Sequence, residues 1–280
     1  MQRIYNYGSF LQAYALKKMM EECGAEVEFV DYHPGECILP SKETTGMKRK
    51  IQKGLEILRM KGRLRDKIQF VKYKKNYARK NYPVLGLKET YNYAPKLDLL
   101  VIGSDEVFNC IQDNSNVGFA PELFGAGHQA DRLVSYAASF GNTTLESLKK
   151  YQVDEQVAQW LRAFDAISVR DDNSRKIVQE LTGKDPVCHL DPVLVYDYPA
   201  NLPETKAKIP QDPYMILYGY SGRFNKEEAG EIRKYAKRKG LKILCIGGIQ
   251  SCGDKFIDCS PFEIFEYFKH AESVVTDTFH

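Results

Sequence analysis

The chain has 280 residues, of which 43% are hydrophobic and 28% are charged, and its formal net charge is +3. This composition is typical of a soluble globular protein and excludes a disordered, fibrous or small disulfide-stapled one. No stretch approaches the roughly 20 apolar residues that span a bilayer, and the start, MQRIYNYGSF, has no signal-peptide core, so we expect a cytoplasmic protein.

The first predicted element is a helix that follows a glycine turn at residues 6–9 and ends at Gly24. Residues 27–30 then form a short strand. The order turn, helix, strand is the second half of a βα unit. Only residues 2–5 are left to form the strand that should precede the helix, so we expect either further residues upstream or a fold that begins differently.

A basic block follows at residues 47–80, with 14 Lys or Arg against Glu56 and Asp66. The rest of the chain carries 26 basic and 35 acidic residues. Helical spacing of apolar residues predicts one or two amphipathic helices with cationic outer faces, packed through Ile51, Leu55, Leu58, Leu64, Ile68 and Val71. Such a face is either simply solvated or contacts an anionic membrane surface. We expect no nucleic-acid partner, because the block contains no recognisable binding module.

Four apolar strands, each followed by a polar or glycine-rich turn, are predicted next. They lie at residues 99–102, 132–140, 166–169 and 187–190, with helices at 148–164 and 174–181. The carboxyl ends of strands in an open α/β sheet share one edge, and that edge is where ligands bind. The turns after these strands are therefore the first place to look for a site.

A proline-rich stretch at residues 201–213 is the predicted linker between two lobes. The first lobe spans residues 1–200 and contains the basic insertion at 47–80; the second spans residues 214–280. Its predicted elements are strands at 214–218, 241–246 and 273–276 and helices at 226–239 and 261–268. The chain stops just after the last strand, so we expect this lobe to be truncated.

Chemistry-bearing side chains follow several strands. The sequence GSDEVFN at 103–109 offers close backbone approach at Gly103, a hydroxyl at Ser104 and a carboxylate at Asp105, or else an ordinary helix cap. Arg170 lies where a strand enters a helix and could hold a carboxylate or phosphate, or pair with Asp171 or Asp172. His280 could exchange a proton or contact an anion, although a lone histidine is more often structural.

The seven cysteines form no CxxC pair, which favours reduced thiols that pack as small buried hydrophobes. No metal site is expected. Neither a GxxxxGK[ST] run nor a strand-linked GxGxxG is present, so P-loop and dinucleotide-binding functions lose their main support. We therefore expect no bound cofactor.

Six segments together resemble the polysaccharide pyruvyl transferase family, and they occur in family order. They are NYGSFLQAYAL (6–16), DLLVIGSDEVFN (98–109), SYAASFG (135–141), ISVRDDNS (167–174), LDPVL (190–194) and VVTDTFH (274–280). Glu106 and Phe108 replace the family's usual glutamine and tryptophan, a change expected to alter the acceptor or stacking surface. The stretch that normally follows the family's histidine is missing.

The resemblance implies an α/β fold of two Rossmann-like lobes, similar to the GT-B glycosyltransferases, with the reaction in the cleft between lobes. It implies transfer of a pyruvyl group from phosphoenolpyruvate to a sugar, free or lipid-linked, as a ketal. His280 and Asp105 are then the expected catalytic residues. The expected substrate-binding residues are Arg170, Ser104, Ser139, Asn6, Gly8, Gly103, Asn109, Thr276 and Asp277.

Two other functions stay open. A glycosyltransferase that uses a nucleotide sugar could be built on the same scaffold, because a fold does not fix a function. A non-catalytic assembly protein could act at the membrane surface through residues 47–80.

Overall fold

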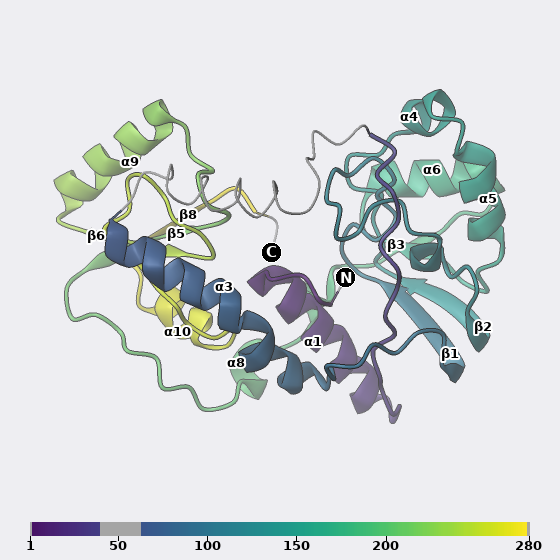
Figure 1. Cartoon of the computed structure of the whole chain (residues 1–280), viewed down its shortest axis with the longest axis horizontal. Helices are drawn as coiled ribbons and strands as arrows, with labels where there is room; N and C mark the ends of the chain where they lie inside the picture. The colour runs from purple at the N-terminus through teal and green to yellow at the C-terminus, as the bar shows by residue number, and fades with distance from the viewer. Residues whose placement is uncertain (1, 40–62, 279–280) are drawn as a thin grey trace. The chain divides into compact units, whose positions relative to one another are not determined.

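The computed structural model describes residues 2–39 and 63–278, which form a mixed α/β fold with parallel sheets (Figure 1). Within these residues the chain divides into two compact units. The first comprises residues 2–4, 8–39 and 85–197, and the second comprises residues 5–7, 63–84 and 198–278. No helix in the described part of the chain is long and apolar enough to cross a membrane.

The first unit is built around short parallel strands flanked by helices. Its elements are α1 (Tyr7–Glu22, which starts in the second unit), β1 (Lys96–Gly103), the 3-10 helix η1 (Pro121–Phe124), β2 (Gln129–Tyr136), α4 (Leu145–Lys150), α5 (Asp154–Arg162), β3 (Ser168–Val169), α6 (Asp172–Thr182), β4 (Val187–Cys188) and α7 (Pro192–Val195). Strand β1 pairs with β2, and β3 pairs with β4. Single bridges join Val134 to Ala166 and Ala138 to Val169, so the strand order runs β1, β2, β3, β4.

Three sequence predictions for this unit are wrong in detail. The glycine turn at residues 6–9 is absent, because α1 already begins at Tyr7. The helix predicted over residues 148–164 is two helices, α4 and α5, since Gln152 adopts a left-handed backbone with φ 57° between them. Residues 27–30 form no strand; the segment makes a single parallel bridge, from Asp31 to Tyr93.

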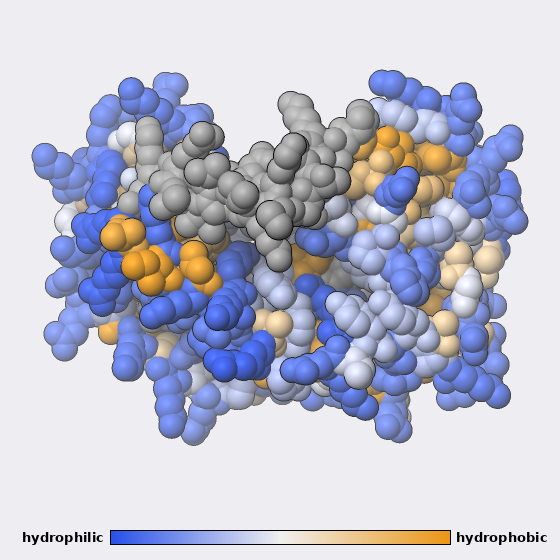
Figure 2. Space-filling view, viewed as in Figure 1, coloured by the Kyte–Doolittle hydropathy of each residue, from blue (hydrophilic) through white to orange (hydrophobic). Residues whose placement is uncertain are grey.

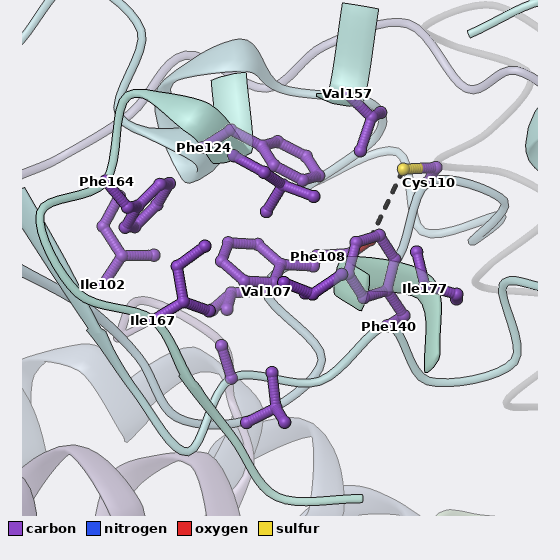
Figure 3. Close-up of a cluster of buried hydrophobic side chains, with 14 of the residues drawn as sticks. Ile102, Val107, Phe108, Cys110, Phe124, Phe140, Val157, Phe164, Ile167 and Ile177 are labelled. Carbon is purple, nitrogen blue, oxygen red and sulfur yellow. Dashed lines mark hydrogen bonds between the residues drawn. The ribbon is translucent and has the colours of Figure 1, made fainter. Parts of the chain in front are cut away.

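The core of the first unit is aromatic, and Phe108 lies at its centre (Figure 3). The ring of Phe108 is fully buried and stacks on Phe124 with 4.9 Å between ring centroids. Phe140 and Phe164 contact the same ring. The Phe108 side chain therefore stabilises the core beneath the strand ends, and its buried ring is not open to a ligand.

The second unit holds a four-stranded parallel sheet in the order β7, β6, β5, β8. Its elements are α3 (Leu64–Leu85), α8 (Tyr198–Asn201), β5 (Tyr214–Tyr218), α9 (Lys226–Lys239), β6 (Lys242–Ile246), β7 (Lys255–Phe256), α10 (Glu263–Lys269) and β8 (Ser273–Thr276). The predicted limits of β5, α9 and β8 are confirmed. Helix α9 is defined by local signals, since Asn225 caps its start and Gly240, at φ 68°, ends it.

Helix α3 lies in this second unit, and its packing differs from the prediction. The side chains of Phe70, Tyr73 and Tyr77 are buried, and Phe70 packs edge-on against Phe256 of β7 at 5.4 Å. The aliphatic residues predicted to pack inward are instead exposed: Leu64 by 70%, Ile68 by 50% and Val71 by 43%. Tertiary packing therefore selects the aromatic face of the helix over the aliphatic one. Residues 47–62 of the basic block lie outside the described part of the chain.

None of the seven cysteines, all of which lie in the described part of the chain, forms a disulfide. Cys110, Cys245, Cys252 and Cys259 are buried, as expected of small hydrophobes, but Cys23 and Cys188 are exposed. Burial raises the pKa of the Cys245 and Cys259 thiols to about 12. These two thiols therefore stay protonated and unreactive at neutral pH.

Candidate active site

The site in the first unit lies where its parallel strands end. Ser104 and Asp105 follow β1, Ser139 comes three residues after β2, Arg170 follows β3, and Asp191 comes three residues after β4. The parallel pairing of β1 with β2 and of β3 with β4 puts these carboxyl ends on one edge of the sheet. Hydrogen bonds between the turns confirm that they meet there.

Arg170 is held by a buried carboxylate. Its Nη1 lies 2.7 Å from Oδ2 of Asp191, which also accepts a hydrogen bond of 2.7 Å from the Ser104 hydroxyl. The Asp191 side chain is fully buried, and the Arg170 side chain is 11% exposed. The sequence analysis offered Asp171 or Asp172 as ion-pair partners of Arg170. The structure instead pairs Arg170 with Asp191, which lies 21 residues further along the chain. Asp171 caps α6 by accepting from the Ser174 amide.

Asp105 carries the second carboxylate near Arg170. Its Oδ1 lies 3.6 Å from Nη2 of Arg170 and accepts a hydrogen bond from the Glu106 amide. Its Oδ2 accepts from the Ser9 hydroxyl at 3.3 Å. The backbone of Asp105 is left-handed, with φ 63°, a conformation that non-glycine residues seldom adopt and that is common at functional sites. The side chain is thus held in place from three directions.

The turn after β2 is tied to the turn after β1. The amide of Ser139 donates to the carbonyl of Asp105 at 3.0 Å, and the Phe108 amide donates to the carbonyl of Ser139. The Ser139 hydroxyl donates to Asp171 at 2.6 Å, which links these turns to the start of α6. The predicted site residue Ser139 therefore connects the loops around Asp105.

Gly103 and Asn109 have local structural contacts in the described chain. A Cβ on Gly103, at φ 145°, would lie 2.0 Å from the carbonyl oxygen of Tyr136, the last residue of β2. Glycine at this position therefore lets the backbone approach β2, whereas the sequence predicted a close approach to a ligand. Asn109 bonds to Glu106, Asn142 and Thr143 and thereby fixes the loop after Asp105. Gly8 is a buried residue of α1.

The remaining predicted residues belong to the second unit. The Asn6 side-chain amide donates to the hydroxyl of Tyr220, and Asp277 forms an ion pair with Arg223. The Thr276 hydroxyl lies 2.9 Å from that of Thr278. His280, the proposed acid, lies outside the described residues, so its role stays a prediction.

Sequence reasoning gave no site role to Asp191 or Ser9. Asp191 could have been suspected from its place in the turn after a short apolar strand, which is the signal that selected Ser104 and Arg170. Ser9 could not, because its contact with Asp105 spans 96 residues and depends on how α1 packs.

The geometry suits acid–base chemistry next to an anchored cation. A carboxylate that touches a guanidinium and two further donors can accept a proton from a hydroxyl, and the guanidinium can bind an anionic group. Among residues 2–39 and 63–278, no group of three or more His, Cys, Asp or Glu side chains is placed to hold a metal ion.

Comparison with known proteins identifies the family of the chain. A search of curated proteins finds no match. The family model described as polysaccharide pyruvyl transferase matches residues 6–280, which is nearly the whole chain and includes each strand end described above. The chain therefore belongs to the polysaccharide pyruvyl transferase family.

Proposed function

We propose that this chain transfers a pyruvyl group from phosphoenolpyruvate to a sugar of a cell-surface polysaccharide or its precursor, forming a pyruvate ketal. Family membership supports the reaction class. The observation that carries the proposal is the Asp105 carboxylate, held 3.6 Å from the Arg170 guanidinium at the sheet edge. The GT-B-like arrangement of two Rossmann-like lobes stays a prediction, as does a cytoplasmic location.

The proposed roles follow from charge. The donor carries a carboxylate and a phosphate, and the planar guanidinium of Arg170 would bind one of them with paired hydrogen bonds. The ion pair with buried Asp191 fixes the position of that guanidinium, because a buried carboxylate without its partner is costly. Asp105 would accept the proton of the attacking sugar hydroxyl.

The bond changes balance without a further reactant. A proton adds to the methylene carbon of phosphoenolpyruvate, and the adjacent carbon becomes an oxocarbenium-like centre. The first sugar hydroxyl attacks that carbon and gives its proton to Asp105; the C–O bond to phosphate then breaks, and the second hydroxyl closes the ketal as its proton leaves with phosphate. We propose His280 as the acid or as a partner of the phosphate.

Replacement of Asp105 tests the proposal. Asp105→Asn keeps the size of the side chain and removes the proton acceptor, so we expect the rate of phosphate release to fall about 10²- to 10⁴-fold. The measurement is inorganic phosphate released from phosphoenolpyruvate in the presence of sugars that have two free hydroxyls. Asp172→Asn is the matched control, because Asp172 is an exposed carboxylate in the first turn of α6, and it should leave the rate unchanged.

Two results would contradict the proposal. One is an Asp105→Asn protein that keeps full activity. The other is a thermal shift with nucleotide sugars and none with phosphoenolpyruvate, which would favour a glycosyltransferase. If Arg170→Ala and His280→Ala both leave the rate of phosphate release unaltered, the roles proposed for these two residues are wrong.

A second candidate function, docking on an anionic membrane, is favoured by the outer face of α3. The exposed side chains Leu64, Ile68 and Val71 are spaced four and three residues apart and so form one stripe on the helix. Lys72 and Lys75 are exposed beside this stripe. Figure 2, viewed as in Figure 1, shows apolar atoms among hydrophilic ones over the first half of α3. Such a face inserts its apolar residues between headgroups while its lysines attract anionic lipid.

Sedimentation with vesicles tests this docking. We expect the protein to bind vesicles that contain anionic lipid, to release them as salt rises, and to lose most binding in Ile68→Asp. Glu231→Ala, at an exposed position of α9, is the control and should bind like the unaltered protein. Binding that ignores ionic strength, or that survives Ile68→Asp, would exclude α3 as the docking face.

A further inference from the structure

An aromatic pair lies at the strand ends of the first unit, and the proposed reaction gives it no role. Tyr136 is the last residue of β2, and His189 directly follows β4. Their rings stack with 5.3 Å between centroids and 24° between planes. Tyr136 is half-buried, whereas His189 is exposed. The pair therefore presents ring surface to solvent at the edge of the sheet that carries Asp105 and Arg170.

Strand register places His189 beside Arg170. Val169 of β3 pairs with Cys188 of β4, and the His189 amide donates to the Val169 carbonyl at 2.9 Å. The next residues along these two strands are Arg170 and His189, which therefore lie side by side. Neighbours of this kind point to the same face of a sheet, and successive residues of a strand alternate between faces. The side chains of Arg170 and His189 thus leave the sheet on one side, and that of Cys188 leaves it on the other.

The buried Asp191 carboxylate connects the aromatic pair to the rest of the site. Asp191 comes two residues after His189, and its Oδ2 lies 2.7 Å both from Nη1 of Arg170 and from the Ser104 hydroxyl. The pKa of Tyr136 is raised by burial and, to a smaller extent, by the negative charge of Asp191. Tyr136 therefore lies within electrostatic reach of the carboxylate that holds the guanidinium.

An exposed ring face beside charged hydrogen-bonding groups suits a sugar. The face of an uncharged aromatic ring carries partial negative charge, which attracts the C–H groups on the apolar face of a pyranose. The hydroxyls at the rim of the pyranose can then bind guanidinium and carboxylate groups around the ring. An anionic donor gains little from such a ring face, because both carry negative charge.

We propose that Tyr136 and His189 form the subsite for the acceptor sugar, with the pyranose on the exposed face of the His189 ring. The proposal rests on the proposed function, since it gives the acceptor of that reaction its place. Tyr136 holds the plane of the imidazole by stacking on its other face. The sugar hydroxyls would lie beside the Arg170 guanidinium, which is 3.6 Å from Asp105, the proposed proton acceptor.

Steady-state kinetics of His189 variants test the subsite. His189→Ala removes the ring, so we expect the KM for the sugar to rise about 3- to 10-fold and the KM for phosphoenolpyruvate to change less than about twofold. His189→Phe keeps a planar ring without the imidazole nitrogens and should restore most of the sugar affinity. Cys188→Ala is the matched control, because Cys188 is exposed and on the opposite face of β4, and it should leave both KM values unaltered.

Binding without turnover separates the subsite from the proposed function. The probes are methyl glucoside, methyl galactoside and methyl mannoside, and saturation-transfer NMR measures their affinity for the protein. Sugar binding that weakens in His189→Ala, in a protein that releases no phosphate from phosphoenolpyruvate, would support the subsite and contradict the proposed reaction. Phosphate release with the same sugar KM in His189→Ala and in the unaltered protein would support the reaction and overturn the subsite.

Other results would also overturn the subsite. A KM in His189→Ala that rises for phosphoenolpyruvate and not for the sugar would place His189 at the donor. A His189→Phe protein that binds sugar as weakly as His189→Ala would show that the imidazole nitrogens, and not the ring face, make the contact. A lower Tm in His189→Ala with unaltered sugar affinity would make the stack with Tyr136 purely structural. Unaltered protein that neither binds nor turns over any of the three sugars would remove the acceptor from this site.

Discussion

Lys74 is a cation placed against aromatic rings in the second unit. Its ammonium lies 5.7 Å from the ring centre of Phe70 and 5.6 Å from that of Tyr73, and it donates to the Tyr5 carbonyl at 3.0 Å. Burial lowers the pKa of Lys74 to about 8, from an ordinary value of 10.5. Because the unfolded chain holds this proton more tightly, the charge costs stability below about pH 8, and the cost disappears as pH rises toward 10.5.

Lys74→Met should therefore raise the Tm at about pH 7, since methionine keeps an unbranched apolar chain without the charge. The gain over the unaltered protein should shrink between pH 8 and 10.5, where Lys74 becomes neutral in both states. Thermal unfolding of both proteins between pH 7 and 10.5 measures this difference in Tm. A gain that does not change with pH would show that packing, and not the proton, causes it.

At the residue scale, the sequence predicted which side chains follow the strand ends but not how they pair. Ser104, Asp105 and Arg170 were selected because each comes directly after an apolar run. The partner of Arg170 could not be selected, because Asp171, Asp172 and Asp191 are all acidic and only the pairing of β3 with β4 brings Asp191 to the guanidinium. A strand register depends on long-range contacts that one sequence does not display.

At the scale of elements, α3 shows how a helix face is chosen. The helical spacing of apolar residues gives α3 two apolar faces, one aliphatic and one aromatic. The sequence analysis predicted that the aliphatic face packs inward, and this prediction is wrong. The aromatic face wins because Phe256 and Tyr7 pack against it, and both come from distant parts of the sequence. By contrast, α9 was predicted to the residue, since its capping residues lie within the local sequence.

A buried carboxylate joins α3 to the sheet of its unit. Asp66 is 7% exposed, and its Oδ1 accepts a hydrogen bond of 3.1 Å from the Phe256 amide of β7. Asp66→Ala would leave that buried amide unpaired, so we expect a loss of about 1–3 kcal/mol in the free energy of unfolding, measured with urea. Asp66→Asn keeps an acceptor oxygen and should lose less. Equal losses for the two variants would show that the charge, rather than the hydrogen bond, matters.

At the scale of the whole molecule, the fold class was predictable and the strand pairing was not. Apolar runs that alternate with helical patterns indicated parallel sheets, and both units contain them. The order β7, β6, β5, β8 places the last strand beside the first of its sheet, which no local pattern announces. The segment at 27–30 carries the composition of a strand but forms none, because a strand exists only where a neighbour supplies hydrogen bonds.

Neither compact unit corresponds to one continuous stretch of the gene. The second unit takes residues 5–7 and α3 from the early part of the chain and joins them to everything after residue 197. Residues 202–213 form neither helix nor strand, and a protease cut there would give a C-terminal fragment that lacks α3. That fragment would lose the hydrogen bond from the Phe256 amide to Asp66 and the packing of Phe70 against the Phe256 ring. The fragment that follows the cut therefore lacks part of its compact unit and is not an independent module.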